Sequence, residues 1–166
     1  MIKHPDNNCC SGFSLIEVLI ALLVLSIGLL GLALLQVTAL QANNDSYFRT
    51  QATLYASEIA DRMRANAAAV TAGSYHVPDT TAANAKKSTY DACKTGGACA
   101  CHTAGIICDT ANLAIYDLGK WYEEQQRVLP QGGERSTITR NGNQHTIVIR
   151  WVERELSMTQ EWVVEL

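Results

Sequence analysis

The chain has 166 residues, 48% of them hydrophobic, with 13 Lys and Arg against 16 Asp and Glu, for a formal net charge of −3. This length suits one domain, or one domain with an anchor, and the acidic balance argues against bulk electrostatic attraction to nucleic acid. The hydrophobic residues are concentrated near the start, because residues 18–35 include no charged side chain. At about 1.5 Å per residue, a helix over this run is long enough to cross a hydrocarbon core of roughly 30 Å.

A polar stretch, MIKHPDNNCCSG, precedes the apolar run, and one carboxylate, Glu17, lies close to its start. A secretory signal peptide would have a basic start and a shorter apolar core, whereas here Lys3 is offset by Asp6. A simple membrane anchor explains the length but gives Glu17 no role, since a carboxylate at the bilayer centre costs about 2.5–3.5 kcal/mol. A position of Glu17 near the membrane edge, within reach of water, is the alternative.

The segment GFSLIEVLIALLVL resembles the class III signal of type IV prepilins and of the related pseudopilins of type II secretion. The resemblance implies that prepilin peptidase cuts between Gly12 and Phe13 and that Phe13 is then N-methylated. It also implies that Glu17 neutralises the amino terminus of a neighbouring subunit during assembly, which would offset the cost of burying a charge. The expected parts are a leader over 1–12, a transmembrane and filament-core helix over 13–35, and a periplasmic head over 36–166. Cys9 and Cys10 fall in the leader.

The helix is expected to continue past the membrane, because no proline occurs between Gln36 and Pro78. Apolar residues recur mostly at intervals of three and four and mark one face: Val37, Leu40, Phe48, Ala52, Tyr55, Ile59 and Met63. One helix from about Phe13 to Asn66 is therefore predicted, apolar all round in its first half and amphipathic in its second. Gly28 and Gly31 lie in the first half, where local softening of the helix and close helix packing are both open explanations.

Residues 67–109 are rich in alanine, threonine, glycine and lysine with little periodicity, which predicts a long loop. Four cysteines would tie it down: Cys93, Cys99, Cys101 and Cys108. Disulfides are favoured over zinc, because no C-x2-C pair is present and His102 is the only nearby imidazole. A bond between Cys99 and Cys101 is disfavoured by their spacing. Two pairings remain open: Cys93–Cys99 with Cys101–Cys108, or Cys93–Cys101 with Cys99–Cys108.

A second helix is expected after this loop, capped by Asp109 or Thr110 and ended by Pro130. Beyond it, Asn141-Gly142 lies between two runs of β-branched residues and predicts a hairpin. Three residues of the second strand should share one side: Ile147, Ile149 and Trp151. The segment MTQEWVVEL supplies a third strand. We therefore expect an α+β protein in which the long helix packs on a small antiparallel sheet of three or four strands.

Three later segments resemble PilV-type minor pilins: ASEIADRMRAN at 56–66, DLGKWYEEQQRVLPQG at 117–132 and TIVIRWVER at 146–154. This implies the type IV pilin fold and a minor pilin that waits in the inner membrane, with its head in the periplasm, before joining a priming or tip complex of the pilus. The implied partners are prepilin peptidase, the membrane, and other minor and major pilins through the N-terminal helix. The alternatives are a minor pseudopilin of type II secretion and a pilus-tip adhesin or DNA-binding subunit.

We expect no enzyme, cofactor, metal or small-molecule substrate. The histidines are scattered along the chain at His4, His76, His102 and His145. No nucleophile–base arrangement, Walker A loop or H-E-x-x-H helix is visible. Nucleic acid is not expected as a partner either, because the head lacks a basic stripe and its loop carries only Lys86, Lys87 and Lys94.

Overall fold

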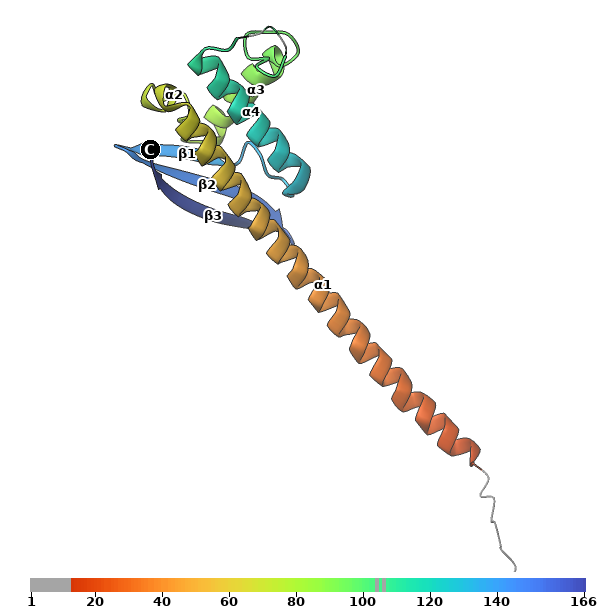
Figure 1. Cartoon of the computed structure of the whole chain (residues 1–166). Coiled ribbons are helices and arrows are strands. Elements are labelled where there is room, and N and C mark those ends of the chain that lie inside the picture. Colours follow the sequence, from red (N-terminus) through yellow and green to blue (C-terminus); the bar gives the residue numbers. More distant parts are fainter. Residues whose placement is uncertain (1–12, 104, 106) are drawn as a thin grey trace, which may run out of the picture. The chain divides into compact units, whose positions relative to one another are not determined.

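The computed structural model describes residues 13–103, 105 and 107–166, so the leader expected over 1–12, with Cys9 and Cys10, lies outside the described residues. The elements run in this order (Figure 1): α1 (Leu15–Ala65), α2 (Ala67–Thr71), α3 (Thr80–Cys93), α4 (Thr110–Val128), β1 (Thr137–Asn141), β2 (Gln144–Glu153) and β3 (Leu156–Glu165). They fall into two compact units, one ending at Asn43 and one covering Asn44–Leu166. The long helix predicted from about 13 to 66 is confirmed as α1, which contributes to both units.

In the first unit α1 carries large apolar side chains on all sides, and all of them are exposed. Leu30 is 67% exposed, for example, and Leu34 is 70% exposed. The hydroxyls of Ser26 and Thr38 donate to the carbonyl oxygens of Leu22 and Leu34, at 2.7 and 3.0 Å, so even these polar side chains are satisfied within the helix. A helix that is apolar all round needs lipid or other helices around it.

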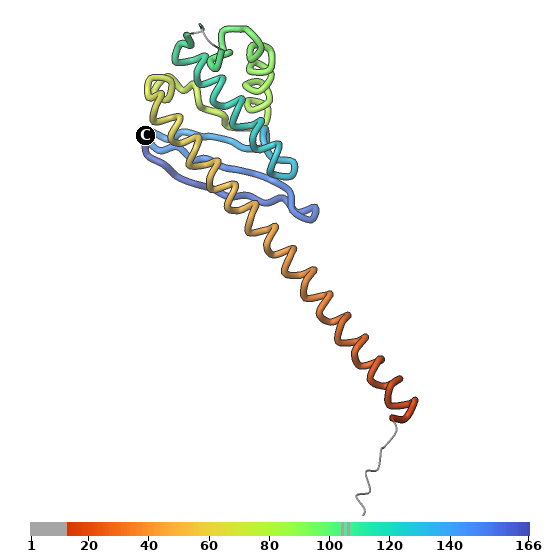
Figure 2. Tube along the Cα trace, turned by 45° about the vertical axis from the view of Figure 1, so that its right-hand side comes forward, coloured from red at the N-terminus to blue at the C-terminus, as the bar shows by residue number. Residues whose placement is uncertain are grey.

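In the second unit, the later half of α1 and α4 cover one face of the three-stranded sheet (Figure 2). The buried residues of α1 are Ala52, Tyr55, Ala56, Ile59, Ala60 and Met63, which bears out the amphipathic pattern after residue 48. They form one core with Leu118 and Trp121 of α4, and with residues of the sheet that are fully or almost fully buried: Ile138, Ile147, Ile149 and Trp151. The shared inward face predicted for the second strand is thus confirmed.

The sheet is antiparallel, in the order β1-β2-β3. The predicted hairpin is present, with Asn141 paired to Gln144, so that the two loop residues are Gly142 and Asn143. Gly142 has a φ of 62°, a left-handed conformation that favours glycine. The predicted third strand is β3, which runs antiparallel to β2 over its whole length. An α+β fold with a long helix on a small antiparallel sheet is therefore observed, as expected.

The prediction of one long loop over 67–109 is wrong, because this segment contains α2 and α3. Helix α3 buries only Ala83 and Tyr90, so it has almost no apolar periodicity to reveal it. Its start is determined locally: the side chain of Asp79 accepts a 2.8 Å hydrogen bond from the backbone N–H of Ala82. In α4 the predicted cap is Asp109, which accepts a 2.7 Å hydrogen bond from the N–H of Asn112.

Helices α3 and α4 approach closely where Tyr90 meets Gly119. The ring of Tyr90 lies directly over the glycine, so that a Cβ added there would be 2.0 Å from Cγ of the ring. Glycine in the middle of a helix costs up to about 1 kcal/mol relative to alanine. Here that cost is explained by packing, because any side chain at position 119 would collide with the Tyr90 ring.

Candidate functional site

The expected processing site begins outside the described residues, since Gly12 is not among them. Phe13 is 82% exposed and precedes the first turn of α1. Glu17 is exposed in that first turn, and its N–H donates to the carbonyl of Ser14 at 3.0 Å. A carboxylate in the first turn is favoured by the partial positive charge of a helix N-terminus. The helix thus holds Glu17 at its start, one turn from Phe13 and available to another molecule.

Two glycines lie within the apolar part of α1. A Cβ built at Gly28 or Gly31 would meet no atom within 4 Å. Packing inside the chain therefore does not require glycine at either position. The two explanations from the sequence, softening of the helix and close packing of a neighbouring helix, both stand.

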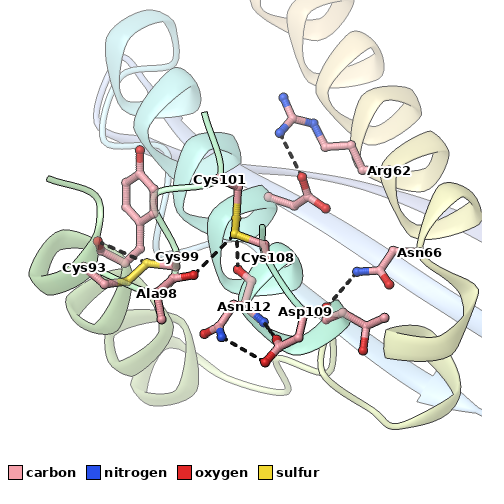
Figure 3. The surroundings of a disulfide bond; sticks show 12 residues. Arg62, Asn66, Cys93, Ala98, Cys99, Cys101, Cys108, Asp109 and Asn112 are labelled. Atoms are coloured by element: carbon pink, nitrogen blue, oxygen red, sulfur yellow. Dashed lines mark hydrogen bonds and ion pairs between the residues drawn. A yellow bond between two sulfur atoms is a disulfide. The ribbon is translucent and has the colours of Figure 1, made fainter. Parts of the chain in front are cut away.

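The four cysteines lie together beside the start of α4 (Figure 3). Cys93 is bonded to Cys99 and Cys101 to Cys108, with Cα–Cα distances of 5.4 and 5.6 Å, which are ordinary for disulfides. The sulfur of Cys108 lies 3.3 Å from the carbonyl oxygen of Ala98, which brings the two bridged loops into contact. Of the two pairings that the sequence left open, the structure has the first.

The bridged segment also rests on a charged cluster between α3 and α4. Lys94 lies 3.4 Å from Glu123, and the Tyr90 hydroxyl donates to the same carboxylate at 3.4 Å. Burial raises the pKa of Tyr90 to about 12, and the negative charge of Glu123 adds to the effect. His102 stacks on Tyr116 with 5.6 Å between the ring centroids. Lys94 and the rings of Tyr90, His102 and Tyr116 therefore contribute to the packing of the segment against α4.

Sequence reasoning missed a polar cluster that joins α1 to α4. Arg62 on α1 lies 3.3 Å from Asp117 on α4, whose side chain is only 9% exposed. Tyr75 donates to the other oxygen of that carboxylate at 2.5 Å, and burial together with this hydrogen bond raises the pKa of Tyr75. Asn66 adds a 2.8 Å hydrogen bond to the carbonyl of Thr110 at the start of α4. The partners are far apart in sequence, and no local pattern marks them as a set.

No group of three or more His, Cys, Asp or Glu side chains suited to a metal ion occurs within the described part of the chain. The four sulfurs of the cysteine-rich segment are engaged in disulfides. Among the residues that the structure describes, one helix, α1, is long and apolar enough to cross a membrane.

Two sequence profiles of known families match the chain. The profile of the Tt1218-like type IV pilins matches residues 34–119, just over half of the chain. The chain belongs to the Tt1218-like family of type IV pilins. The prokaryotic N-terminal methylation motif matches this pilin over residues 7–33, a range that includes Gly12, Phe13, Glu17 and most of the apolar part of α1. No curated protein and no solved structure matches the pilin at a significant level.

The matched ranges clarify which structural features belong to the family pattern. The Tt1218-like match covers the amphipathic half of α1, the bridged segment and the first half of α4, and so includes Arg62 and Asp117. The hairpin and β3 lie outside it. The resemblance stated from the sequence, a type IV pilin with a class III signal, is thereby confirmed.

Proposed function

We propose that this pilin is a minor pilin that takes part in priming or tip assembly of a type IV pilus. It is made as a precursor with a leader over 1–12, which prepilin peptidase removes between Gly12 and Phe13 before Phe13 is N-methylated. The observation that carries the proposal is the methylation motif over residues 7–33, which overlaps the exposed apolar part of α1.

Before assembly, the segment 13–35 crosses the inner membrane once and the head, 36–166, lies in the periplasm. Disulfides suit that oxidising compartment. During assembly the same apolar segment moves from lipid into the bundle of helices at the centre of the filament. The partners are prepilin peptidase, the membrane, and other pilins. The role is structural, and the protein needs no cofactor.

Glu17 pairs its carboxylate with a cation of a neighbouring subunit during assembly. A carboxylate moved away from water is costly alone, but a cation close to it offsets much of that cost. The methylated amine of Phe13 in a neighbouring subunit supplies such a cation once the leader has been cut. Cleavage therefore removes a polar segment and at the same time creates the partner for the carboxylate.

Two variants test processing and assembly separately. Gly12→Val should leave a full-length precursor in the membrane, whereas mass spectrometry of the wild type should find a chain that begins with methylated Phe13. Glu17→Val should be processed normally but be depleted from sheared filaments, with Ser26→Ala as the control inside the same apolar segment. Normal incorporation of Glu17→Val would remove the assigned role of the carboxylate, and a mature start near Asn43 would support a secretory signal peptide instead.

A minor pseudopilin of a type II secretion system is the alternative. The Tt1218-like match favours the pilus, because that family is described as type IV pilins. Deletion separates the two: loss of pili and twitching motility supports the pilus role, and loss of exoprotein secretion with normal pili supports the alternative.

A further inference from the structure

Strand β3 is at the edge of the sheet and has one free side. Its partner on the other side is β2, and the N–H of Leu166 continues that pairing by donating to the carbonyl of Asn143 at 3.0 Å. Hydrogen-bonded and non-hydrogen-bonded pairs alternate along an antiparallel ladder, so this bond shows which residues of β3 direct their backbone groups toward β2 and which direct them away. The residues whose N–H and C=O groups point away from β2 are Ser157, Thr159, Glu161, Val163 and Glu165. Within the part of the chain that the structure describes, no hydrogen bond reaches these backbone groups.

A groove lies beside this free edge, between β3 and α1. It has a volume of about 330 Å³ and is lined by Ala56, Ser57, Ala60, Asp61, Arg64, Trp162 and Val164. The small side chains of Ala56 and Ala60 leave space there. Trp162 and Val164 contact the core but are only partly buried, so the apolar face of the sheet is incompletely covered at its edge. One more strand beside β3 would cover it.

The edge has few of the features that usually prevent strands from adding. It extends over ten residues, Leu156–Glu165, and contains no proline and no lysine. The face of β3 that points away from α1 carries the exposed carboxylates of Glu161 and Glu165. Among the described residues neither carboxylate has a cationic partner. The free edge therefore combines unpaired backbone groups, a groove with both apolar and polar lining on one face, and negative charge on the other.

A second copy of β3 is a poor occupant. Two copies of β3 could pair antiparallel so that the free backbone groups of all five residues, Ser157 to Glu165, are used. The two Glu161 side chains would then lie directly opposite each other. Like charges in that position destabilise a strand pair. An occupant with Lys or Arg opposite Glu161 would be stabilised by the pairing of opposite charges.

We propose that the free edge of β3 binds an extended segment of a different protein, which adds as a fourth strand. Its apolar side chains, at alternate positions, face Trp162, Val164 and the groove beside α1. Its intervening Lys or Arg side chains face Glu161 and Glu165. Backbone hydrogen bonds give the affinity and the alternating side chains give the specificity, as in other cases of strand addition. The inference goes beyond the proposed function, because it involves only the second unit and is independent of processing at Gly12.

The probe is the peptide acetyl-(Lys-Val)4-amide, added to the full chain in neutral detergent micelles. We expect saturable binding that weakens with salt. We also expect slower amide hydrogen exchange at Thr159, Glu161 and Val163, measured by NMR. The same peptide N-methylated at every residue cannot donate to β3 in either strand direction and should not bind. Equal binding of the methylated peptide, or protection elsewhere than β3, would overturn the proposal.

Variants of the edge provide a second line of evidence. Thr159→Pro removes an outward N–H without removing a bond to β2, and should weaken peptide binding at least about tenfold while the circular dichroism spectrum stays native. Glu161→Lys with Glu165→Lys should weaken binding about fivefold at low salt. Glu155→Lys makes the same kind of charge change on the exposed turn before β3 and is the control, expected to bind as the wild type does. If Glu155→Lys weakens binding equally, or if the β3 amides become protected with rising protein concentration and no peptide, the proposed occupant is wrong.

Discussion

The guanidinium of Arg62 lies 3.3 Å from the carboxylate of Asp117, so the later half of α1 and the middle of α4 are joined by a charge pair that is mostly shielded from water. The same guanidinium also pairs with Glu58 one turn earlier, and the same carboxylate accepts from Tyr75. One buried carboxylate therefore ties together three segments of the head: α1, α4 and the chain that follows α2.

The first prediction concerns Asp117→Asn. The substitution keeps the size of the side chain but removes the charge that both Arg62 and Tyr75 use, so the free energy of unfolding should fall by about 1–3 kcal/mol. Chemical denaturation of the full chain in micelles measures it. The matched control is Asp61→Asn, whose ion pair with Arg64 is exposed and should change stability by less than about 1 kcal/mol. Equal losses of stability at the two sites would mean that the Asp117 cluster contributes no more than an exposed ion pair.

The second prediction concerns Gly119→Ala. Alanine is the better helix former, yet its methyl group would enter the Tyr90 ring, so we expect destabilisation of about 1–3 kcal/mol. In a Tyr90→Ala background the collision is gone, and the same change should become neutral or stabilise by up to about 1 kcal/mol. A double-mutant cycle by thermal unfolding measures this change of sign. A constant effect of Gly119→Ala in both backgrounds would contradict the steric explanation.

The third prediction concerns the cysteine pairing. Cys93→Ser should leave Cys99 as a free thiol if the observed bond between them forms, whereas the other pairing would leave Cys101 free. Alkylation of the unfolded protein under acid conditions, followed by mass spectrometry, locates the free thiol. Each small loop that is closed contributes roughly 2 kcal/mol in the chain-entropy account, so reduction of both bonds should lower stability by a few kcal/mol. A label on Cys101 would contradict the observed pairing.

The fourth prediction concerns pH and His145, which is buried in β2. Burial lowers its pKa, the nearby charges of Arg140 and His76 lower it further, and a backbone contact with Asn143 opposes them. The folded protein therefore binds fewer protons here than the unfolded chain does. The contribution to stability is complete above the unfolded pKa of about 6.5 and is lost as the pH falls toward the lowered value.

The measurement is the free energy of unfolding between about pH 7 and pH 5. The difference between the wild type and His145→Gln should change with pH by at most about 1.4 kcal/mol per unit. His102→Gln, at an exposed position, is the control and should retain the wild-type dependence. A pH dependence unaffected by removal of His145 would show that other groups cause it.

Short-range signals in the sequence determined much of this protein. The class III signal was read from a few neighbouring residues, and the amphipathic half of α1 from the spacing of residues such as Ile59 and Met63. Asp109 marked the start of α4 and Pro130 its end, and Asn141-Gly142 located the hairpin to within one residue. The class III signal was recognised by resemblance, and the other features depend on physics that acts over a few residues: burial of one helix face, capping, or the φ angle that a turn requires.

Tertiary structure decided the rest. Helix α3 was missed because it buries only Ala83 and Tyr90, although the Asp79 cap was present as a signal. The reason for glycine at 119 is visible only when the Tyr90 ring lies against it, and the partner of Arg62 is 55 residues away at Asp117. The choice between two cysteine pairings and the free edge of β3 also depend on where distant segments meet. Such contacts reflect packing across the whole head, which local propensity does not encode.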